Sequence, residues 1–188
     1  GRGLDTARIL SLKQDRAGRL WVGTRVGLYV GEGQGAQRKF TRLNLPEGVD
    51  KEVFYRCLED RDGRIWAPGS RGLALLEDGH WRRFTERDGL SSLWVRAVAQ
   101  APDGGIWIGY FDPGKMSRLD KRQGRWDVRH QVLGKGDRSH HAFSIAFESG
   151  GAMWVGTEDG LQVMERVKWR RHSRETGLGL NDTGPGAL

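Results

Sequence analysis

The stretch DRAGRLWVGTRVGL, residues 15–28, places a short apolar segment between two turn signals that contain glycine, and the chain repeats it with small changes. Related stretches begin at Asp60 (DRDGRIWAPGSRGL), at Ala101 (APDGGIWIGYFDPGKM) and at Glu148 (ESGGAMWVGTEDGL). Self-similarity at a regular period is typical of repeat architectures. The sequence therefore predicts a repeat array and not a set of unrelated domains.

The period indicates which kind of array this is. The tryptophans of the four stretches are separated by 45, 41 and 47 residues, at Trp21, Trp66, Trp107 and Trp154. Periods of roughly 40–50 residues are typical of propeller blades. A glycine stands three residues before each tryptophan, at Gly18, Gly63, Gly104 and Gly151. Glycine suits a tight turn there because it accepts positive φ without a Cβ clash.

Apolar segments on either side of these turns predict the strands of each unit. Before each first turn lies a short apolar run: ARILSL, VFYRCL, VRAVAQ and HAFSIAF. After the second turn the first three units continue through a glycine-containing hairpin signal into a further strand. We expect an all-β fold, a β-propeller segment of about four four-stranded antiparallel blades. The tryptophans should pack between blades, because one sheet cannot bury both of its faces.

The repeat also predicts the extent of the units. They are expected at residues 4–45, 46–90, 91–136 and 137–178 of one domain spanning 1–188, with 179–188 as the start of a further unit. ETGLGLND, near the end of the chain, repeats the RDGLSSLW of an earlier blade connection. We therefore expect an open arc of a larger ring, with the remaining blades as its partners.

Composition excludes several classes of function. The chain has a mean hydropathy of −0.63, and no run approaches the ~20 apolar residues of a membrane helix, so we expect no membrane contact. The net charge of +7 comes from arginines spread along the chain, and no nucleic-acid-binding motif accompanies it. Cys57 is the only cysteine, which excludes an internal disulfide. No catalytic triad order, nucleophile elbow or Walker loop is present, and no cofactor or catalytic residue is predicted.

Strand order divides the turns between the two rims of a propeller. First-to-second and third-to-fourth turns share one rim, while second-to-third turns and blade connections share the other. The latter rim varies most between units, so we expect a ligand there and not at the uniform D-x-x-G turns. The candidate residues on it are Arg25, Arg71, Tyr110, Asp112, His140, Glu158 and Asp159. Arg25 and Arg71 occupy matching turns and favour an anionic or polyhydroxyl ligand, a small polar or carbohydrate-like molecule.

Metal binding is not predicted. His140 and His141 lie near Asp137, but adjacent strand residues point to opposite faces and serve one site only where the loop bends. The D-x-x-G turns resemble calcium-loop fragments and supply too few oxygen atoms for the ~6–8 ligands that Ca²⁺ takes.

The motif D-x-x-G-x-L-W-x-G-T-x-x-G-L of the first unit, with FTERDGL at 84–90, resembles the two-component regulator propeller repeat. The resemblance covers nearly the whole chain and is best in LWVGTRVGL and MWVGTEDGL. The second unit departs from it with Pro68-Gly69, and the third with Tyr110 and an extra residue before Gly114.

This resemblance implies a function. The family forms sensor propellers of hybrid histidine kinases and diguanylate cyclases, commonly with about seven blades. It implies a ligand-sensing region without catalysis, in the periplasmic or extracytoplasmic part of an inner-membrane receptor. The parent would be membrane-anchored and dimeric, with a transducing segment, a membrane span and a cytoplasmic output domain after the propellers.

Two other functions stay open. A carbohydrate-active propeller enzyme, a lyase or glycosidase, would draw on Asp112, Glu158 and Asp159, and a glycosidase needs two carboxylates roughly 5–10 Å apart. A protein-interaction scaffold would use the propeller rim as a docking surface.

Overall fold

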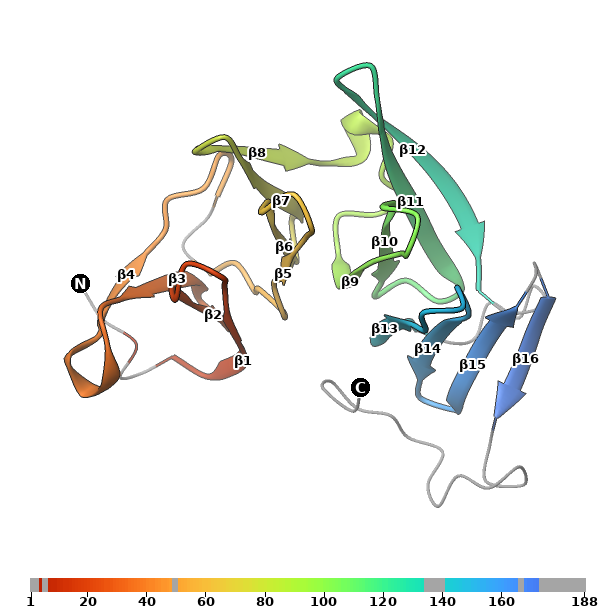
Figure 1. Cartoon of the computed structure of the whole chain (residues 1–188), viewed down its shortest axis with the longest axis horizontal. Coiled ribbons are helices and arrows are strands. Elements are labelled where there is room, and N and C mark those ends of the chain that lie inside the picture. The colour runs from red at the N-terminus through yellow and green to blue at the C-terminus, as the bar shows by residue number, and fades with distance from the viewer. Residues whose placement is uncertain (1–3, 5–6, 49–50, 134–140, 166–167, 173–188) are drawn as a thin grey trace.

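The chain folds into four antiparallel sheets, each with its four strands in chain order (Figure 1). The structure is a computed structural model, and it describes residues 4, 7–48, 51–133, 141–165 and 168–172. The described residues include two short 3-10 helices, Gly35–Gln37 and Glu86–Asp88, and no α-helix. The predicted all-β class and the four-stranded meander are confirmed.

Each sheet forms one blade. The first blade consists of β1 (Ile9–Gln14), β2 (Leu20–Thr24), β3 (Gly27–Glu32) and β4 (Lys39–Arg42). The second consists of β5 (Leu58–Glu59), β6 (Ile65–Gly69), β7 (Gly72–Glu77) and β8 (His80–Phe84). The third consists of β9 (Val95–Gln100), β10 (Ile106–Tyr110), β11 (Lys115–Arg122) and β12 (Arg125–Val132). The fourth consists of β13 (Ser144–Phe147), β14 (Met153–Thr157), β15 (Gly160–Glu165) and β16 (Lys168–His172).

Each sheet lies within one predicted repeat unit, and the unit boundaries themselves stay predictions. The further unit expected at 179–188 lies outside the described residues. Within the described ranges, no helix has the length and apolar character needed to cross a membrane.

The repeat residues occupy equivalent places in every blade, as predicted. Trp21, Trp66, Trp107 and Trp154 are each the second residue of the second strand. The glycine before each of them has positive φ, from 81° at Gly18 to 94° at Gly104. The first turn therefore needs glycine in all units.

Apolar cores lie between neighbouring blades. The cores join Trp21 to Phe54 and Ile65, Trp66 to Val95 and Ile106, and Trp107 to Ala142 and Met153. Each of these tryptophans therefore faces the following blade, and their exposed fractions are only 2%, 0% and 8%. This packing supplies the burial that a single four-stranded sheet lacks.

A second glycine, two residues after the tryptophan, lets successive blades approach closely. A Cβ added at Gly23 in β2 would lie 2.6 Å from the carbonyl oxygen of Tyr55 and 2.7 Å from that of Phe54, both in the second blade. At Gly109 in β10 it would lie 2.5 Å from the Cβ of Ala142, in the fourth blade. The W-x-G pattern therefore encodes packing between blades.

The first and fourth blades form the two ends of an open arc (Figure 1). Trp81 in β8 and Trp169 in β16 pack against the cores that their blades share with the preceding blades. Phe40, at the corresponding outer-strand position of the first blade, is 41% exposed, and Leu12 in β1 is 58% exposed. The fold is thus a partial ring, with apolar side chains uncovered on its first blade.

Buried carboxylates bind the D-x-x-G turns to the blade cores. Asp60 Oδ2 accepts a hydrogen bond from Trp66 Nε1 at 2.8 Å, and Asp15 Oδ2 accepts one from Trp21 Nε1 at 2.8 Å. These aspartates are 2% and 5% exposed, respectively. The D-x-x-G-x-x-W spacing therefore encodes an Asp–Trp hydrogen bond in addition to the turn.

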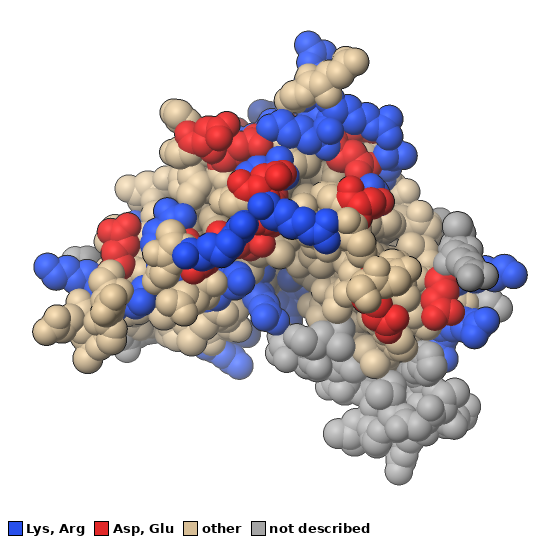
Figure 2. Space-filling model, in the orientation of Figure 1, with Lys and Arg blue, Asp and Glu red and all other residues tan. Residues whose placement is uncertain are grey.

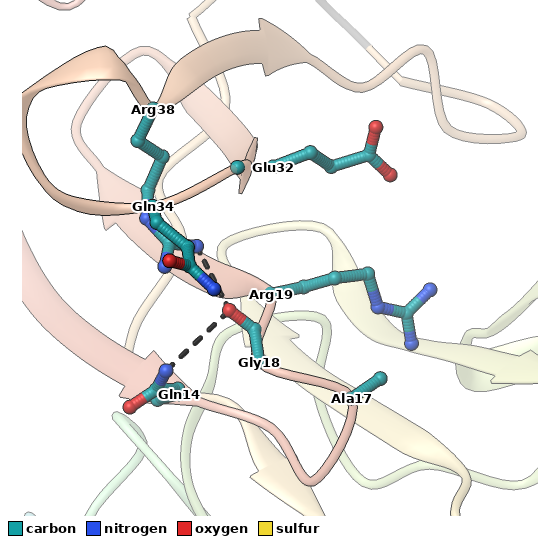
Figure 3. A pocket seen from close by; sticks show the side chains of 8 residues that line it. Gln14, Ala17, Gly18, Arg19, Glu32, Gln34 and Arg38 are labelled. Carbon is teal, nitrogen blue, oxygen red and sulfur yellow. Dashed lines mark hydrogen bonds between the residues drawn. The ribbon is translucent and has the colours of Figure 1, made fainter.

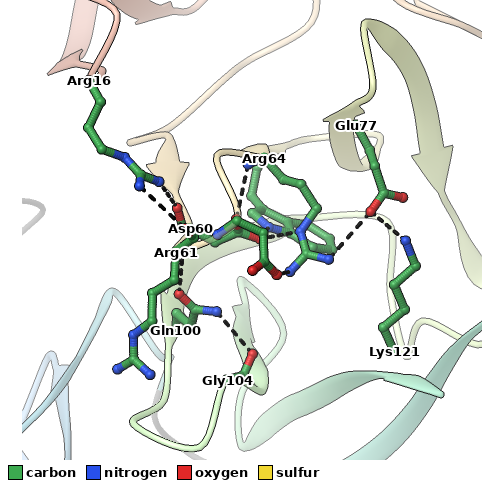
Figure 4. A network of polar contacts seen from close by, with 10 residues as sticks. Arg16, Asp60, Arg61, Arg64, Glu77, Gln100, Gly104 and Lys121 are labelled. Carbon is green, nitrogen blue, oxygen red and sulfur yellow. Dashed lines mark hydrogen bonds and ion pairs between the residues drawn. The ribbon is translucent and has the colours of Figure 1, made fainter. Parts of the chain in front are cut away.

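The same turns are joined from blade to blade (Figure 4). The backbone N–H of Arg16 donates to Glu59 Oε2 at 2.9 Å, and its Nη1 donates to the carbonyl oxygen of Arg61 at 3.3 Å. Arg61 makes the same two kinds of bond from the second blade to the third. Its backbone N–H donates to Gln100 Oε1 at 2.9 Å, and its Nη1 donates to the carbonyl oxygen of Pro102 at 2.6 Å. Arginine residues of this rim thus hydrogen-bond one blade to the next.

Acidic and basic side chains are intermingled on the surface (Figure 2). Lys121 Nζ lies 2.6 Å from Glu77 Oε1, and Arg118 Nη2 lies 2.7 Å from Asp120 Oδ1. On the face that Figure 2 shows, the positive charges lie among acidic groups and solvate the surface.

Candidate functional site

The rim opposite the D-x-x-G turns gathers the turns and connections that the strand order predicts. The Ser70 N–H, in the β6–β7 turn, donates to the Val53 carbonyl at 3.0 Å, and the Gly72 N–H donates to the Leu93 carbonyl at 2.5 Å. Val53 and Leu93 belong to the two connections that flank the second blade. We call this surface the variable rim, defined by the β2–β3, β6–β7, β10–β11 and β14–β15 turns and the blade connections.

A buried ion pair holds one of these connections in place. Arg83 in β8 and Glu52 are 8% and 2% exposed, and they pair through two parallel contacts, one of them from Arg83 Nη2 to Glu52 Oε2 at 3.0 Å. Arg83 Nε also donates to the carbonyl of Pro46 at 2.7 Å. The connection after β4 is therefore fixed to the second blade by a bidentate arginine fork.

The predicted site residues differ in their surroundings. Arg25 and Arg71 are exposed at the tips of the β2–β3 and β6–β7 turns. Asp112 is half-buried in the β10–β11 turn, 3.5 Å from Lys115 Nζ. Asp159 lies in the β14–β15 turn, 3.6 Å from Arg171 Nη2. His140 lies outside the described residues.

Tyr110 differs from the other candidates because its side chain is fully buried. Its hydroxyl donates to Ser117 Oγ at 2.9 Å and accepts from the Ser91 N–H at 3.0 Å. Burial, the largest effect, raises the pKa of the Tyr110 hydroxyl. These contacts give Tyr110 a place in the core between the second and third blades.

Glu158 contacts His141 at the start of the fourth blade. Its carboxylate accepts the His141 N–H at 2.8 Å and lies 2.5 Å from the ring Nδ1. Burial acts to raise the pKa of Glu158, but hydrogen bonds from backbone groups and His141 outweigh it, so the pKa lies below its usual value. Glu158 therefore fixes the orientation of the His141 ring.

Two of the inner strands, β1 and β9, carry an irregular residue near this rim. In β1 the pairing with β2 shifts between Ile9 and Ser11, and in β9 the pairing with β10 shifts between Val95 and Ala97. The extra residues of these bulges are Leu10 and Arg96. Matching backbone contacts place Tyr55 and Phe143 at the same position in the second and fourth blades. A bulged residue lies outside the regular ladder and is re-aimed relative to its neighbours.

Aromatic side chains form a continuous cluster on the variable rim. Trp94 and Phe111 stack at 4.7 Å between ring centroids, Phe111 lies 5.0 Å from His141, and His141 stacks on Phe143 at 5.9 Å. Trp94 and Phe111 are each 41% exposed. An exposed pair of stacked rings is an apolar surface that a ligand can cover.

Arg96 lies among these rings. Its Cζ is 4.0 Å from the ring centroid of Tyr55 and 5.6 Å from that of Phe143, so it lies between aromatic residues of both neighbouring blades. Desolvation by burial lowers the pKa of Arg96, with an opposing contribution from Tyr55. The Tyr55 hydroxyl accepts a hydrogen bond from Trp94 Nε1 at 2.8 Å. We call Tyr55, Trp94, Arg96, Phe111, His141 and Phe143 the aromatic–arginine cluster.

Sequence reasoning considered His141 for a metal site and placed none of the other rings of this cluster in the site. A usable signal lies in the aligned inner strands, where Arg8-Ile9-Leu10, Val53-Phe54-Tyr55, Trp94-Val95-Arg96 and His141-Ala142-Phe143 correspond. The middle residue is apolar in each case, whereas the outer two vary in charge and size. The middle position must be apolar for packing, whereas the fold does not restrict the residue type at the two positions beside it.

Other hollows lie away from this rim. One of about 320 Å³ lies on the D-x-x-G rim of the first blade and includes Gln14, Gly18 and Arg38 in its lining (Figure 3). Arg38 Nη1 donates to the carbonyl oxygens of Gly18 at 2.9 Å and Gly31 at 2.7 Å, so its guanidinium is engaged by the backbone. Among the described residues, no three His, Cys, Asp or Glu side chains are grouped to hold a metal ion.

Comparison with known protein families identifies the repeat. The family described as "Two component regulator propeller" matches residues 3–25 and 89–112. These segments contain Trp21 and Trp107 with their preceding glycines. None of the curated protein sequences matches the chain.

Solved structures share the fold. The extracellular domain assigned to the hybrid two component system BT3049 of B. thetaiotaomicron matches with a TM-score of 0.73 and 14% identity, over 96% of this chain and 25% of that chain. That of the one component system BT4673 from the same organism matches with 0.65 and 20%, over 87% and 23%. Virginiamycin B lyase from Staphylococcus aureus matches with 0.68 and 14%, over 92% and 57%.

At these identities the likeness concerns the fold alone. The chain spans a quarter or less of the two extracellular domains and little more than half of the lyase. The regular tryptophan period, the four meander sheets and the matched segments agree with one another. Two segments of the chain thus match the two-component regulator propeller family, and the chain forms a partial β-propeller ring.

Proposed function

We propose that this chain is the ligand-sensing propeller region of a bacterial signal-transduction receptor and is not catalytic in itself. The receptor would present it outside the cytoplasm, as part of a membrane-anchored dimer, and further blades would complete a ring of about seven. The ligand would be a small polar or carbohydrate-like molecule. The family of the repeat supports the signalling role, and the variable rim supports the binding role.

The aromatic–arginine cluster is the observation that carries this proposal. It joins exposed rings, Trp94 and Phe111, to a partly buried cation at the rim end of the inner strands. Figure 1 shows the first strand of each blade along the concave side of the arc. Ligand sites combine apolar surface with a few fixed polar groups, and this cluster has both.

A binding screen tests the proposal. The chain would be screened against neutral and charged saccharides and small polar metabolites by thermal shift, and the hits would be titrated by calorimetry. Phe111→Ala should weaken binding about tenfold or more, because it removes half of the stacked pair. Val132→Ala, at a 45% exposed position in β12, is the control and should bind as the parent does. Hits that bind Phe111→Ala and Trp94→Ala unchanged would place the site elsewhere.

The receptor part has its own test. The coding sequence that continues beyond this region should specify further blades, a membrane span and a kinase or cyclase output domain. A continuation into a secreted enzyme with no membrane span would contradict the receptor proposal.

A carbohydrate-active enzyme is the second candidate, and the His141–Glu158 pair favours it. Both side chains are partly exposed, at 25% and 32%, and His141 borders the exposed ring of Phe111. Such a pair can exchange protons with a bound substrate. Turnover of polysaccharides that is lost in Glu158→Gln would support the enzyme, and binding without turnover supports the sensor.

A further inference from the structure

Arg96 differs in its partners from Arg83, Arg64 and Arg118, which are also shielded from solvent. Arg83 pairs with Glu52, Arg64 with Asp60 at 2.6 Å, and Arg118 with Asp120 at 2.7 Å. In the described part of the chain, Arg96 has no carboxylate within ion-pair distance, and the groups next to it are the rings of Tyr55 and Phe143. A desolvated cation without a counter-ion attracts an anion more strongly than a solvated one does.

Tyr55 adds a second donor at the same place. Its oxygen accepts the indole N–H of Trp94, so its own O–H is oriented away from that contact and can donate to another acceptor. Arg96 lies over the Tyr55 ring at 4.0 Å. The guanidinium N–H groups and the phenol O–H are therefore neighbours, and a group with two acceptor oxygens can satisfy both.

We propose that Arg96 and Tyr55 form a carboxylate subsite, and that the adjacent stacked pair of Trp94 and Phe111 covers the flat face of the ring that carries this carboxylate. A planar carboxylate matches the arginine fork better than a spherical anion does. The ligand class is thus a small ring acid, either an acidic sugar or an aromatic acid. This inference rests on the proposed binding role of the variable rim.

Matched acids and neutral analogues test the subsite. The chain would be titrated by calorimetry with D-glucuronate and D-glucose, and with benzoate and benzamide, at low ionic strength. At least one acid should bind about tenfold or more tightly than its neutral partner, as expected for a charged hydrogen bond. The acid that shows this preference distinguishes the sugar from the aromatic source.

Variants assign the preference to these residues. Arg96→Gln should reduce the preference for the acid to less than about twofold, and Tyr55→Phe should weaken acid binding roughly threefold to tenfold. Arg96→Lys keeps the charge without the fork and should fall between the parent and Arg96→Gln, which provides a second measurement if Arg96→Gln does not fold. Arg122→Gln, at an exposed arginine that ends β11 away from this rim, is the control and should bind as the parent does.

Three results would overturn the subsite. They are equal affinity for acid and neutral partner, an unchanged acid preference in Arg96→Gln, and no binding of either acid up to roughly 50 mM, where even weak charge-assisted sites are occupied. A neutral ligand that loses affinity in Phe111→Ala would still support the sensor. The two proposals therefore fail separately.

Discussion

The indole N–H of Trp66 donates to Asp60 Oδ2 at 2.8 Å, and the two residues are 0% and 2% exposed. Through this bond a surface turn is fixed to the core between the second and third blades. The same carboxylate accepts a hydrogen bond from Arg64 Nε at 2.6 Å. One aspartate thus accepts from a buried ring donor and from an arginine that also contacts Asp62 and Glu77.

Removing this carboxylate should destabilise the fold. We expect Asp60→Ala to lower the free energy of unfolding by about 2–4 kcal/mol, because it leaves a buried N–H without an acceptor and removes the buried carboxylate that pairs with Arg64. Urea denaturation followed by tryptophan fluorescence measures the change. Asp62→Ala is the control, because it removes the 66% exposed partner of Arg64 and keeps the bond to Trp66, and it should change stability far less. Equal losses in the two variants would show that the bond to Trp66 contributes nothing.

The close approach of blades at Gly23 predicts a steric effect. Gly23→Ala should destabilise the chain by roughly 1–3 kcal/mol, because the new methyl group meets backbone carbonyls of the second blade, which have little freedom to move. Denaturant midpoints of the two proteins measure it. Gly150→Ala provides the comparison, since an added Cβ there has nothing within 4 Å and should be tolerated.

The buried pair of Arg83 and Glu52 should behave as a unit. Glu52→Ala should cost about 3–5 kcal/mol, because it leaves the Arg83 cation buried without its counter-ion. The double variant Glu52→Leu/Arg83→Met should recover much of that loss, since it removes both charges and keeps apolar volume. A double-mutant cycle gives the coupling, and additive single effects would contradict the pairing.

Low pH should destabilise the third blade, because it protonates Asp120. The hydrogen bond from Arg118, the largest effect, holds the pKa of Asp120 below its ordinary value of 3.8. The pKa of Asp120 is lower in the folded state than in the unfolded state. Its contribution to stability is therefore complete at pH values above the unfolded-state pKa, and it is lost as the pH falls through the folded-state pKa. Asp120→Asn should therefore be less sensitive to pH between about 5 and 2 than the parent. Asp127→Asn, on the same sheet and 51% exposed, should keep the parent's pH dependence.

The single thiol should report on unfolding. Burial raises the pKa of Cys57 to about 12. Since the thiolate is the reactive form, iodoacetamide at a pH of about 8 should modify the native chain very slowly and the urea-unfolded chain readily. Mass spectrometry of the alkylated protein measures the ratio. Rapid labelling of the native chain would show that this core opens locally.

The sequence predicts the features that recur and misses those that depend on one local irregularity. Trp21, its equivalents and the turn glycines follow from the period, and so does the grouping of turns on the variable rim. Tyr110 takes the place of Thr24 and Thr157, which are themselves fully buried, so that position faces inward whichever residue fills it. Arg96 depends on a bulge in β9, and a sequence does not reveal where an extra residue leaves the ladder.

The rim ends of the inner strands have an evolutionary consequence. Leu10, Tyr55, Arg96 and Phe143 differ in size and charge although their blades share one scaffold. A side chain at one of these positions can mutate without changing the backbone bonds of its blade, so selection on stability constrains it weakly. Gene duplication followed by single-codon changes at these positions would give paralogues with new specificities on an unchanged ring. Recognition in such proteins can therefore diverge faster than architecture.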